Sequence, residues 1–516
     1  MPTPRQRVFR FGLGLFLLCS VGQAALRLPA LFSAHMVLQS GTVVPVWGWA
    51  GAGETVKVSV AGREETVRAN ATGKWRVDLR DLPAGGPYVL KVEVGADHVS
   101  VEDVLVGEVW LGSGQSNMGF PFSGKTFPYL QVMNYEQEKA AADFPLIRMF
   151  LQENSQVADT VQEDCRGKWI VTTPDAIDDF SAVLFFFGRN LHQNLHRPVG
   201  LIKSAVGGTG IELWIDAAAQ RSQPATREYL QQMDREKAAF DDAKAKAAYA
   251  HELAVWEKEA AEAKQAGKKE PRRPNDPAVM LRRNYTYGGL FNSKIAPLIP
   301  YGIAGIIWYQ GEANAGVAWR APYYREQLPL LVTDWRKHWG RELPFAWVQL
   351  PNFEQKSGGW PLVREAMLDA LSLPRTGMTV AIDVGEPDNI HPKNKQEVGH
   401  RLAAWALGDV YGQGNETAGP LFKQLAVHGA EVEISFTHTT GGLLARGGGL
   451  KGFAVAGADK QWQPAQARIV GDRVVVSSPQ VGTPVAVRYA WASNPECNLY
   501  NGAGLPASPF RTWRED

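Results

Sequence analysis

VLVGEVWLGSGQSNM, residues 104–118, is the stretch that decides the fold. Its first part, Val104 to Leu111, is an apolar run typical of a strand buried on both faces of a parallel sheet. The run passes directly into a turn in which small residues surround Ser116. A nucleophilic serine needs a sharp turn of this kind, because the turn lifts its hydroxyl clear of the sheet and lets its amide face an oxyanion. The stretch predicts a reactive serine at the carboxyl end of a strand.

Four further apolar runs predict the remaining strands of the same sheet. Loops and helix-like segments separate them, and this alternation indicates a largely parallel sheet covered by helices. We therefore predict an α/β domain over residues 104–414. The four runs are Val199 to Ile202, Ile303 to Trp308, Phe345 to Leu350 and Met378 to Ile382.

Short strands broken by turn residues flank this domain and predict a small β-sandwich over 25–103 and a second β-domain over 415–516. A helical insertion interrupts the α/β domain at about 220–277, because Arg227 to Lys269 is rich in Ala, Glu, Lys and Gln. Its charges alternate in sign, which is typical of a solvated helix. Three roles stay open for it: a lid, a dimer contact or neither.

The N-terminus predicts export. Basic residues precede an apolar run, Phe11 to Val21, and Gly22 and Ala24 follow, which is the order of a secretory signal peptide over residues 1–24. We expect a secreted or periplasmic product that is not inserted in a membrane. Cys19 leaves with this segment, whereas Cys165 and Cys497 either form one disulfide or stay free.

The composition excludes some classes of partner. The chain has 516 residues, 45% of them hydrophobic and 21% charged, as in a soluble globular protein, and 17 are tryptophan. Its formal net charge of +1 gives no reason to expect nucleic acid as a partner. The oligomeric state is not predicted.

Loops that leave the carboxyl ends of parallel strands form the ligand site of such sheets. The loop after the second run holds adjacent glycines, and the loop after the third places Glu312 in a polar cluster, where it either ties down the loop or contacts substrate. After the fifth run, Asp388 stands three residues before His391, close enough to orient the imidazole and stabilise its cation. Together, Ser116, His391 and Asp388 predict a catalytic triad.

Six motifs resemble the sialate O-acetylesterase family. That family belongs to the SGNH hydrolases, so the resemblance implies a flavodoxin-like three-layer sandwich with Ser116 as nucleophile, His391 as base and Asp388 as their carboxylate. It also implies an oxyanion hole made by the amides of Ser116 and Gly208, with the Gln310 side chain as a third donor. The motifs are GQSNM at 114–118, WYQGE at 308–312, IHPKNKQEVG at 390–399, LFSAHMVLQ at 31–39, VPVWG at 44–48 and PFRT at 509–512.

One departure from the family concerns the residue before Ile390. Many relatives read Asp-Ile-His-Pro there, whereas this chain has Asn389. If residue 389 supplied the carboxylate of the triad, the triad of this chain would have no carboxylate. Asp388 stands at the signature spacing and is the carboxylate that we expect.

The resemblance implies an esterase that removes O-acetyl groups from carbohydrates by serine acyl transfer, with no metal or organic cofactor. His192 and His196 have the spacing of helical metal ligands, but Gln193 stands where the zinc protease motif has glutamate. We expect activity to fall below roughly pH 6.5, as the histidine base becomes protonated.

The substrate is open between 9-O-acetylated sialic acid and acetylated plant polymers such as xylan and xyloglucan. A lipase or thioesterase and a non-catalytic carbohydrate-binding protein are the alternatives of other kinds. Four residues are candidates for substrate binding: Gln115, Glu312, Trp214 and Trp319. For Trp308, core packing is an equal alternative.

Overall fold

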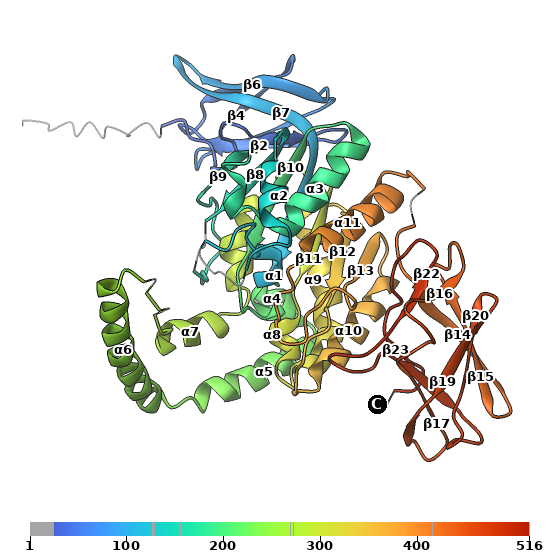
Figure 1. The fold of residues 1–516 in the computed structure, drawn as a ribbon. Helices are drawn as coiled ribbons and strands as arrows, with labels where there is room; N and C mark the ends of the chain where they lie inside the picture. Colours follow the sequence, from blue (N-terminus) through green and yellow to red (C-terminus); the bar gives the residue numbers. More distant parts are fainter. Residues whose placement is uncertain are drawn as a thin grey trace, which may run out of the picture.

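The computed structural model describes residues 25–516 except 126–129, 154–155, 269, 272, 415 and 515–516. The predicted signal segment 1–24 and Cys19 lie outside the described residues. The predicted α/β fold with extra β-sheet domains is confirmed (Figure 1).

The central sheet is built around β7, a strand that ends at the turn containing Ser116. The strands expected from the five apolar runs pair in parallel, in the spatial order β10-β7-β11-β12-β13. Among these five strands, numbered along the chain, the order is 2-1-3-4-5, and ligands of parallel sheets bind beyond the carboxyl ends where the order reverses. The strands are β7 (Asp97–Gly114), β10 (Val199–Ala205), β11 (Gly305–Tyr309), β12 (Phe345–Gln349) and β13 (Thr376–Val380).

Two strands that the sequence analysis missed extend the sheet beyond β10. β8 (Phe144–Gln152) pairs in parallel with β10, and β9 (Gly167–Thr172) pairs antiparallel with β8, so the sheet is mixed. β8 was missed because Pro145 and Arg148 interrupt its apolar pattern. The Arg148 side chain is nevertheless buried, since its guanidinium pairs with Asp103 at 2.7 Å between Nη1 and Oδ2.

Helices cover both faces of the sheet. Consecutive residues of a strand point to opposite faces, and Ile306 and Ile307 accordingly belong to two different buried clusters. On one face α3 (Ala182–Leu195) packs against α11 (Lys395–Trp405), and on the other α9 (Tyr324–Trp339) packs against α10 (Gly359–Asp369).

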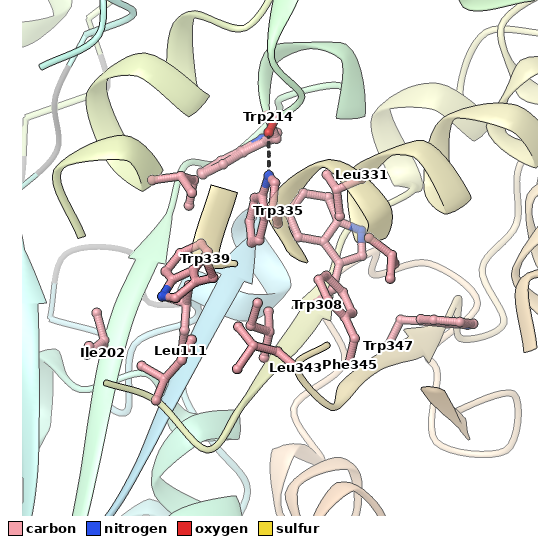
Figure 2. Close-up of a cluster of buried hydrophobic side chains, with 14 of the residues drawn as sticks. Leu111, Ile202, Trp214, Trp308, Leu331, Trp335, Trp339, Leu343, Phe345 and Trp347 are labelled. Carbon is pink, nitrogen blue, oxygen red and sulfur yellow. Dashed lines mark hydrogen bonds between the residues drawn. The ribbon is translucent and has the colours of Figure 1, made fainter. Parts of the chain in front are cut away.

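A group of tryptophans fills the space between α9 and the sheet (Figure 2). Trp335 has no exposed surface, and its ring lies edge-on to Trp308 with 5.8 Å between the ring centroids. Its indole N–H donates to the carbonyl of Trp214 at 2.8 Å, so the one polar atom of the ring is satisfied. The cluster ties the loop after β10 to the helix layer.

The N-terminal β-domain shares strand β7 with the central sheet. The first half of β7 pairs with β6, and β1 joins it in parallel before the second half enters the α/β domain. The strands are β1 (Val37–Gln39), β2 (Val44–Trp49), β3 (Thr55–Val60), β4 (Arg63–Arg68), β5 (Lys74–Leu79) and β6 (Gly85–Val94).

The insertion is an arm of helices that projects from the α/β domain (Figure 1). Its helical stretch is broken at 239–241, where the Asp241 carboxylate caps the next helix by accepting from the Lys244 amide at 2.9 Å. Tyr229 on α5 packs against Trp319, and this contact anchors the arm to the α/β domain. The helices of this region are α4 (Ala217–Ser222), α5 (Pro224–Ala238), α6 (Asp242–Gln265) and α7 (Pro277–Asn284).

Short antiparallel sheets form the C-terminal β-domain. Cys165 and Cys497 are both free thiols, which decides between the two alternatives left open for them. In the part of the chain that the structure describes, no helix is long and apolar enough to cross a bilayer. The strands are β14 (Leu421–His428), β15 (Glu431–Thr437), β16 (Leu443–Ala445), β17 (Phe453–Ala456), β18 (Trp462–Pro464), β19 (Gln466–Val470), β20 (Arg473–Ser477), β21 (Ala486–Tyr489), β22 (Leu499–Asn501) and β23 (Phe510–Arg511).

We predict that Trp335→Ala lowers the free energy of unfolding by about 3–5 kcal/mol, because it empties a ring-sized volume in the core. Urea denaturation followed by tryptophan fluorescence measures this loss. Val470→Ala is the control: Val470 is 50% exposed, so a change within about 0.5 kcal/mol is expected. A loss in Trp335→Ala no larger than that of the control would contradict the role of the cluster.

Candidate active site

The turn that presents Ser116 is formed where β7 and β11 end side by side. Gly114 has φ +136°, and a Cβ there would lie 2.2 Å from the Tyr309 carbonyl oxygen, so only glycine fits. The amide of Gln115 donates to the same carbonyl at 3.0 Å. Ser116 then begins the short helix α1 (Ser116–Gly119) at the point where the strand order reverses.

His391 reaches Ser116 from the loop after β13. The distance from His391 Nε2 to Ser116 Oγ is 2.8 Å, which is a hydrogen bond. Asn389 holds this loop: its Oδ1 accepts from the His391 amide, and its Nδ2 donates to the His391 carbonyl and to Glu386 Oε2, each at 3.0 Å. An aspartate at 389 would lack the donor that makes the last two bonds.

Asp388, the predicted carboxylate of the triad, lies on the same loop as His391 and is exposed. The 2.8 Å bond brings Ser116 and His391 together. The role of Asp388 as the third member stays a prediction.

A buried polar network lies beneath the pair and joins three loops. Asn117 donates from Nδ2 to Glu312 Oε1 at 2.7 Å and to the Ile390 carbonyl at 3.0 Å. Lys395 donates from Nζ to Asn117 Oδ1 at 2.7 Å and to the Pro392 carbonyl at 2.6 Å. Asn117, the residue after the nucleophile, is therefore bonded directly to Ile390 and, through Lys395, to Pro392.

Burial sets the protonation of this network. It lowers the pKa of Lys395 to about 7 and raises the pKa of Glu312, although their opposite charges partly offset these shifts. The pKa of His391 is lowered to about 4, first by burial and second by the nearby Lys395 cation. His391 is therefore a neutral imidazole over most of the pH range, able to accept a proton from Ser116. The decline in activity that the sequence placed below roughly pH 6.5 is therefore expected at a lower pH.

The adjacent glycines after β10 lie beside the nucleophile. A Cβ on Gly207 would lie 3.4 Å from Ser116 Cβ, while Gly208 has φ +68° and accepts at its carbonyl from Arg283 of α7 at 3.4 Å. Any side chain at 207 would press against Ser116. The backbone alone therefore borders the serine on this side.

Gln310 is placed differently from the role that the resemblance implied. Its side chain is fully buried, and its Nε2 donates to the Thr209 carbonyl at 3.0 Å and to Asn314 Oδ1 at 2.8 Å. A side-chain amide has two N–H donors, and both are used. Gln310 holds the loop after β10 against the loop after β11. It could serve as a third donor to the oxyanion only if one of these two bonds broke.

The candidates for substrate binding are placed mostly inside the protein. Gln115 is buried and accepts from the Ala313 amide at 3.3 Å, and Glu312 belongs to the network beneath Ser116. Trp214 has no exposed surface and packs on Trp308 in the core. Trp319 donates to Glu236 Oε1 at 2.7 Å and anchors α5. Trp214 therefore has no surface on which a sugar could stack, whereas the partly exposed Trp319 stays a candidate for substrate binding.

The histidines with metal-ligand spacing serve a local purpose. His192 Nδ1 bonds to the Arg197 carbonyl at 2.7 Å, and His196 ends α3 in the left-handed conformation. Over the described residues, no group of three or more His, Cys, Asp or Glu side chains is arranged to hold a metal ion.

Sequence reasoning gave no role to Asn117 and Lys395. Both lie within motifs of the resemblance, directly after Ser116 and four residues after His391. The available signals were a polar residue directly after the nucleophile and a lysine on the same helix face as Val398 and Leu402. Neither predicts burial, which depends on the loops that close over them.

Comparison with known proteins gives consistent results. The family model described as "Carbohydrate esterase, sialic acid-specific acetylesterase" matches residues 282–407. The sialate O-acetylesterase of Rattus norvegicus is 30% identical over 94% of this chain and 94% of its own length, and that of Mus musculus is 28% identical over 97% of each. A carbohydrate acetylesterase from Xanthomonas citri is 37% identical, with 95% of this chain and 100% of that chain covered and a TM-score of 0.79.

We predict that kcat/KM for p-nitrophenyl acetate stays level from pH 7 to about pH 5 and falls as the pH drops through about 4. Activity falls toward low pH because protonation inactivates His391, whose pKa is lowered to about 4. Lys395→Met should shift this decline to higher pH, because the cation that opposes protonation is gone. A pH profile measured on both proteins tests this.

Lys393→Met is the matched control, since it removes an exposed cation two residues away. Its profile should coincide with that of the wild type. Circular dichroism at each pH excludes unfolding as the cause of any decline. A wild-type midpoint near 6.5, or a Lys395→Met profile that does not move, would contradict the assignment.

Proposed function

The chain is a carboxylic ester hydrolase that belongs to the sialate O-acetylesterase family, and on this basis we propose that it removes O-acetyl groups from carbohydrates with Ser116 as nucleophile and His391 as general base. The observation that carries the assignment is the 2.8 Å hydrogen bond between His391 Nε2 and Ser116 Oγ. A serine hydroxyl bonded to a neutral imidazole is an activated nucleophile.

In the first step His391 Nε2 takes the Ser116 proton as Ser116 Oγ attacks the acetyl carbonyl carbon. The carbonyl oxygen becomes an oxyanion, which the amides of Ser116 and Gly208 stabilise. The tetrahedral intermediate collapses, the sugar oxygen leaves with the proton from His391, and an acetyl-serine remains. Desolvation makes the imidazolium costly to form alone, but the oxyanion that forms at the same moment compensates its charge.

In the second step water attacks the acetyl-serine. His391 takes a proton from the water and returns it to Ser116 Oγ as the C–O bond breaks, which releases acetate. The network of Asn117, Glu312 and Lys395 keeps Ser116 and His391 at bonding distance through both steps. Gln310 contributes by fixing the loop of Gly208 rather than by donating to the oxyanion.

We assign Asp388 as the carboxylate of this scheme, because it stands three residues before His391 on the same loop. It orients the imidazole and stabilises its cation. Asn389 fixes the loop through its bonds to the amide and the carbonyl of His391.

The proposal extends to the fold type and to export. The 2-1-3-4-5 strand order with a nucleophile at the switch point supports an SGNH-type catalytic domain. The segment 1–24 supports secretion or transport to the periplasm as a signal peptide.

We predict that Ser116→Ala abolishes acetate release while the melting temperature stays within a few degrees of the wild type, because the change removes only a hydroxyl. Acetate is measured in parallel from 9-O-acetylated sialic acid, acetylated xylan and acetylated xyloglucan. Short p-nitrophenyl esters should be preferred to long ones, in contrast to a lipase. Activity of Ser116→Ala within tenfold of the wild type would exclude Ser116 as nucleophile, and glycan binding without turnover in the wild type would favour a non-catalytic protein.

We predict that Asp388→Asn lowers kcat by several orders of magnitude, as His391→Ala does. In a serine triad whose aspartate holds the histidine, the corresponding amide substitution costs about 10⁴ in kcat. Steady-state kinetics with p-nitrophenyl acetate measure both losses. A loss below about tenfold in Asp388→Asn would exclude Asp388 as the carboxylate of the triad.

A further inference from the structure

Three clefts follow one another from the nucleophile to the N-terminal β-domain. The proximal cleft, about 450 Å³, includes Val206 of the loop beside Ser116, and Val279 and Arg283 of α7 form its other wall. It shares Gln156 with a middle cleft of about 450 Å³. The middle cleft shares Gln162 with a third cleft of about 460 Å³, which we call the tryptophan cleft. Each pair of neighbouring clefts thus has one wall residue in common, and we call this row of three clefts the groove.

The tryptophan cleft is built on the outward face of the β2–β5 ribbon. Trp47 and Trp49 are two residues apart on β2 and therefore point to the same side. Their antiparallel partners on β5 are Arg76 and Lys74, so two indoles and two long cations share one face. Both indoles are only partly buried and line the cleft. Pro300 belongs to the opposite wall, which the α/β domain supplies.

Aromatic faces beside polar side chains are suited to binding sugars. The face of an indole carries negative charge density, which attracts the C–H groups on the flat side of a pyranose ring, and side chains such as Asn70 and Gln162 in the same wall can bond to hydroxyls. The lining holds the cations Arg68, Lys74 and Arg76, of which Lys74 pairs with Glu163 and Arg76 with Asp78. Arg27 lies over one face of Trp49 at 3.6 Å and pairs with Asp164. With most of this positive charge compensated, the cleft suits a neutral sugar that contacts the exposed parts of the indoles.

We propose that the tryptophan cleft is an accessory subsite that binds neutral sugar units of a polysaccharide while an acetyl group on the same chain lies at Ser116. The inference rests on the proposed esterase function and specifies its substrate as a polymer. A single sugar fills only one of the three clefts, since each has the volume of an ordinary small-molecule site. The insertion gains a role as well, because α7 forms one wall of the groove next to the catalytic residues.

The test is the effect of Trp49→Ala on polymer and small substrates. Wild type and variant are assayed with acetylated xylan, acetylated xyloglucan and p-nitrophenyl acetate. The KM for the polymer should rise about threefold to tenfold, as expected for the loss of one aromatic stacking contact. The ratio of kcat/KM for the polymer to that for p-nitrophenyl acetate should fall by the same factor. Trp49→Phe, which keeps a ring, should recover part of the loss.

Trp462→Ala is the matched control. Trp462 is also a partly buried indole beneath an arginine: Arg488 lies over it at 4.8 Å, as Arg27 lies over Trp49 at 3.6 Å. It belongs to the C-terminal β-domain and does not line the groove. Its polymer-to-ester ratio should equal that of the wild type, which separates loss of the subsite from the general effect of removing an indole.

A second measurement is binding without turnover. Affinity electrophoresis of Ser116→Ala in gels that contain acetylated xylan or xyloglucan should show retardation, and adding Trp49→Ala should reduce it. Unchanged polymer KM in Trp49→Ala, or equal effects of Trp49→Ala and Trp462→Ala, would overturn the subsite. Release of acetate from free 9-O-acetylated sialic acid but from neither polymer would also overturn it and leave the esterase proposal intact, whereas an active Ser116→Ala would refute the nucleophile alone.

Discussion

The hydrogen-bond ladder of β7 is the constraint on which the rest of the molecule depends. This strand, Asp97–Gly114, pairs with β6 and β1 in the N-terminal β-domain and then with β10 and β11 in the central sheet. Its first part, Asp97–Val104, pairs with β6, and its last part, Trp110–Gly114, is bonded on both sides. The N-terminal β-domain and the nucleophile turn are therefore built on one continuous strand, which gives the rigid support that a groove for an extended ligand needs.

Burial controls the protonation of the groups in the site. The pKa of the His391 imidazole is lowered by burial and by the nearby Lys395 cation. Lys395 is itself buried, and its ammonium is held by Asn117 and by the carbonyl of Pro392. A buried cation is costly unless its donors are satisfied, so the network holds the loops in one arrangement. As a result, the base His391 stays uncharged at acidic pH down to its lowered pKa.

Sequence patterns predicted the elements whose signal is local. The five buried strands are apolar runs, the insertion has a composition typical of helices, and the chemistry-bearing residues follow strand ends. The inner strand β8 was missed because Arg148, which breaks its apolar pattern, is neutralised by Asp103 from another part of the chain. Trp214 was assigned to substrate and Gln310 to the oxyanion, whereas the Trp214 indole is fully buried and the Gln310 amide is bonded to Thr209 and Asn314. The role of Asp388, inferred from its spacing to His391, stays a prediction.

The helical arm has a consequence for how such an enzyme changes over evolutionary time. Of the residues of α6, all within the described part of the chain, Ala260 alone is buried, so the arm can lengthen or shorten with little effect on the core. Closing a longer connection costs only about 0.6 kcal/mol for each doubling of its length. The arm leads into α7, which borders the groove, while Ser116 and His391 stand on the sheet. Insertions and deletions there can retune which glycans are accepted and leave the acyl-transfer machinery untouched, so specificity and catalysis are free to diverge at different rates.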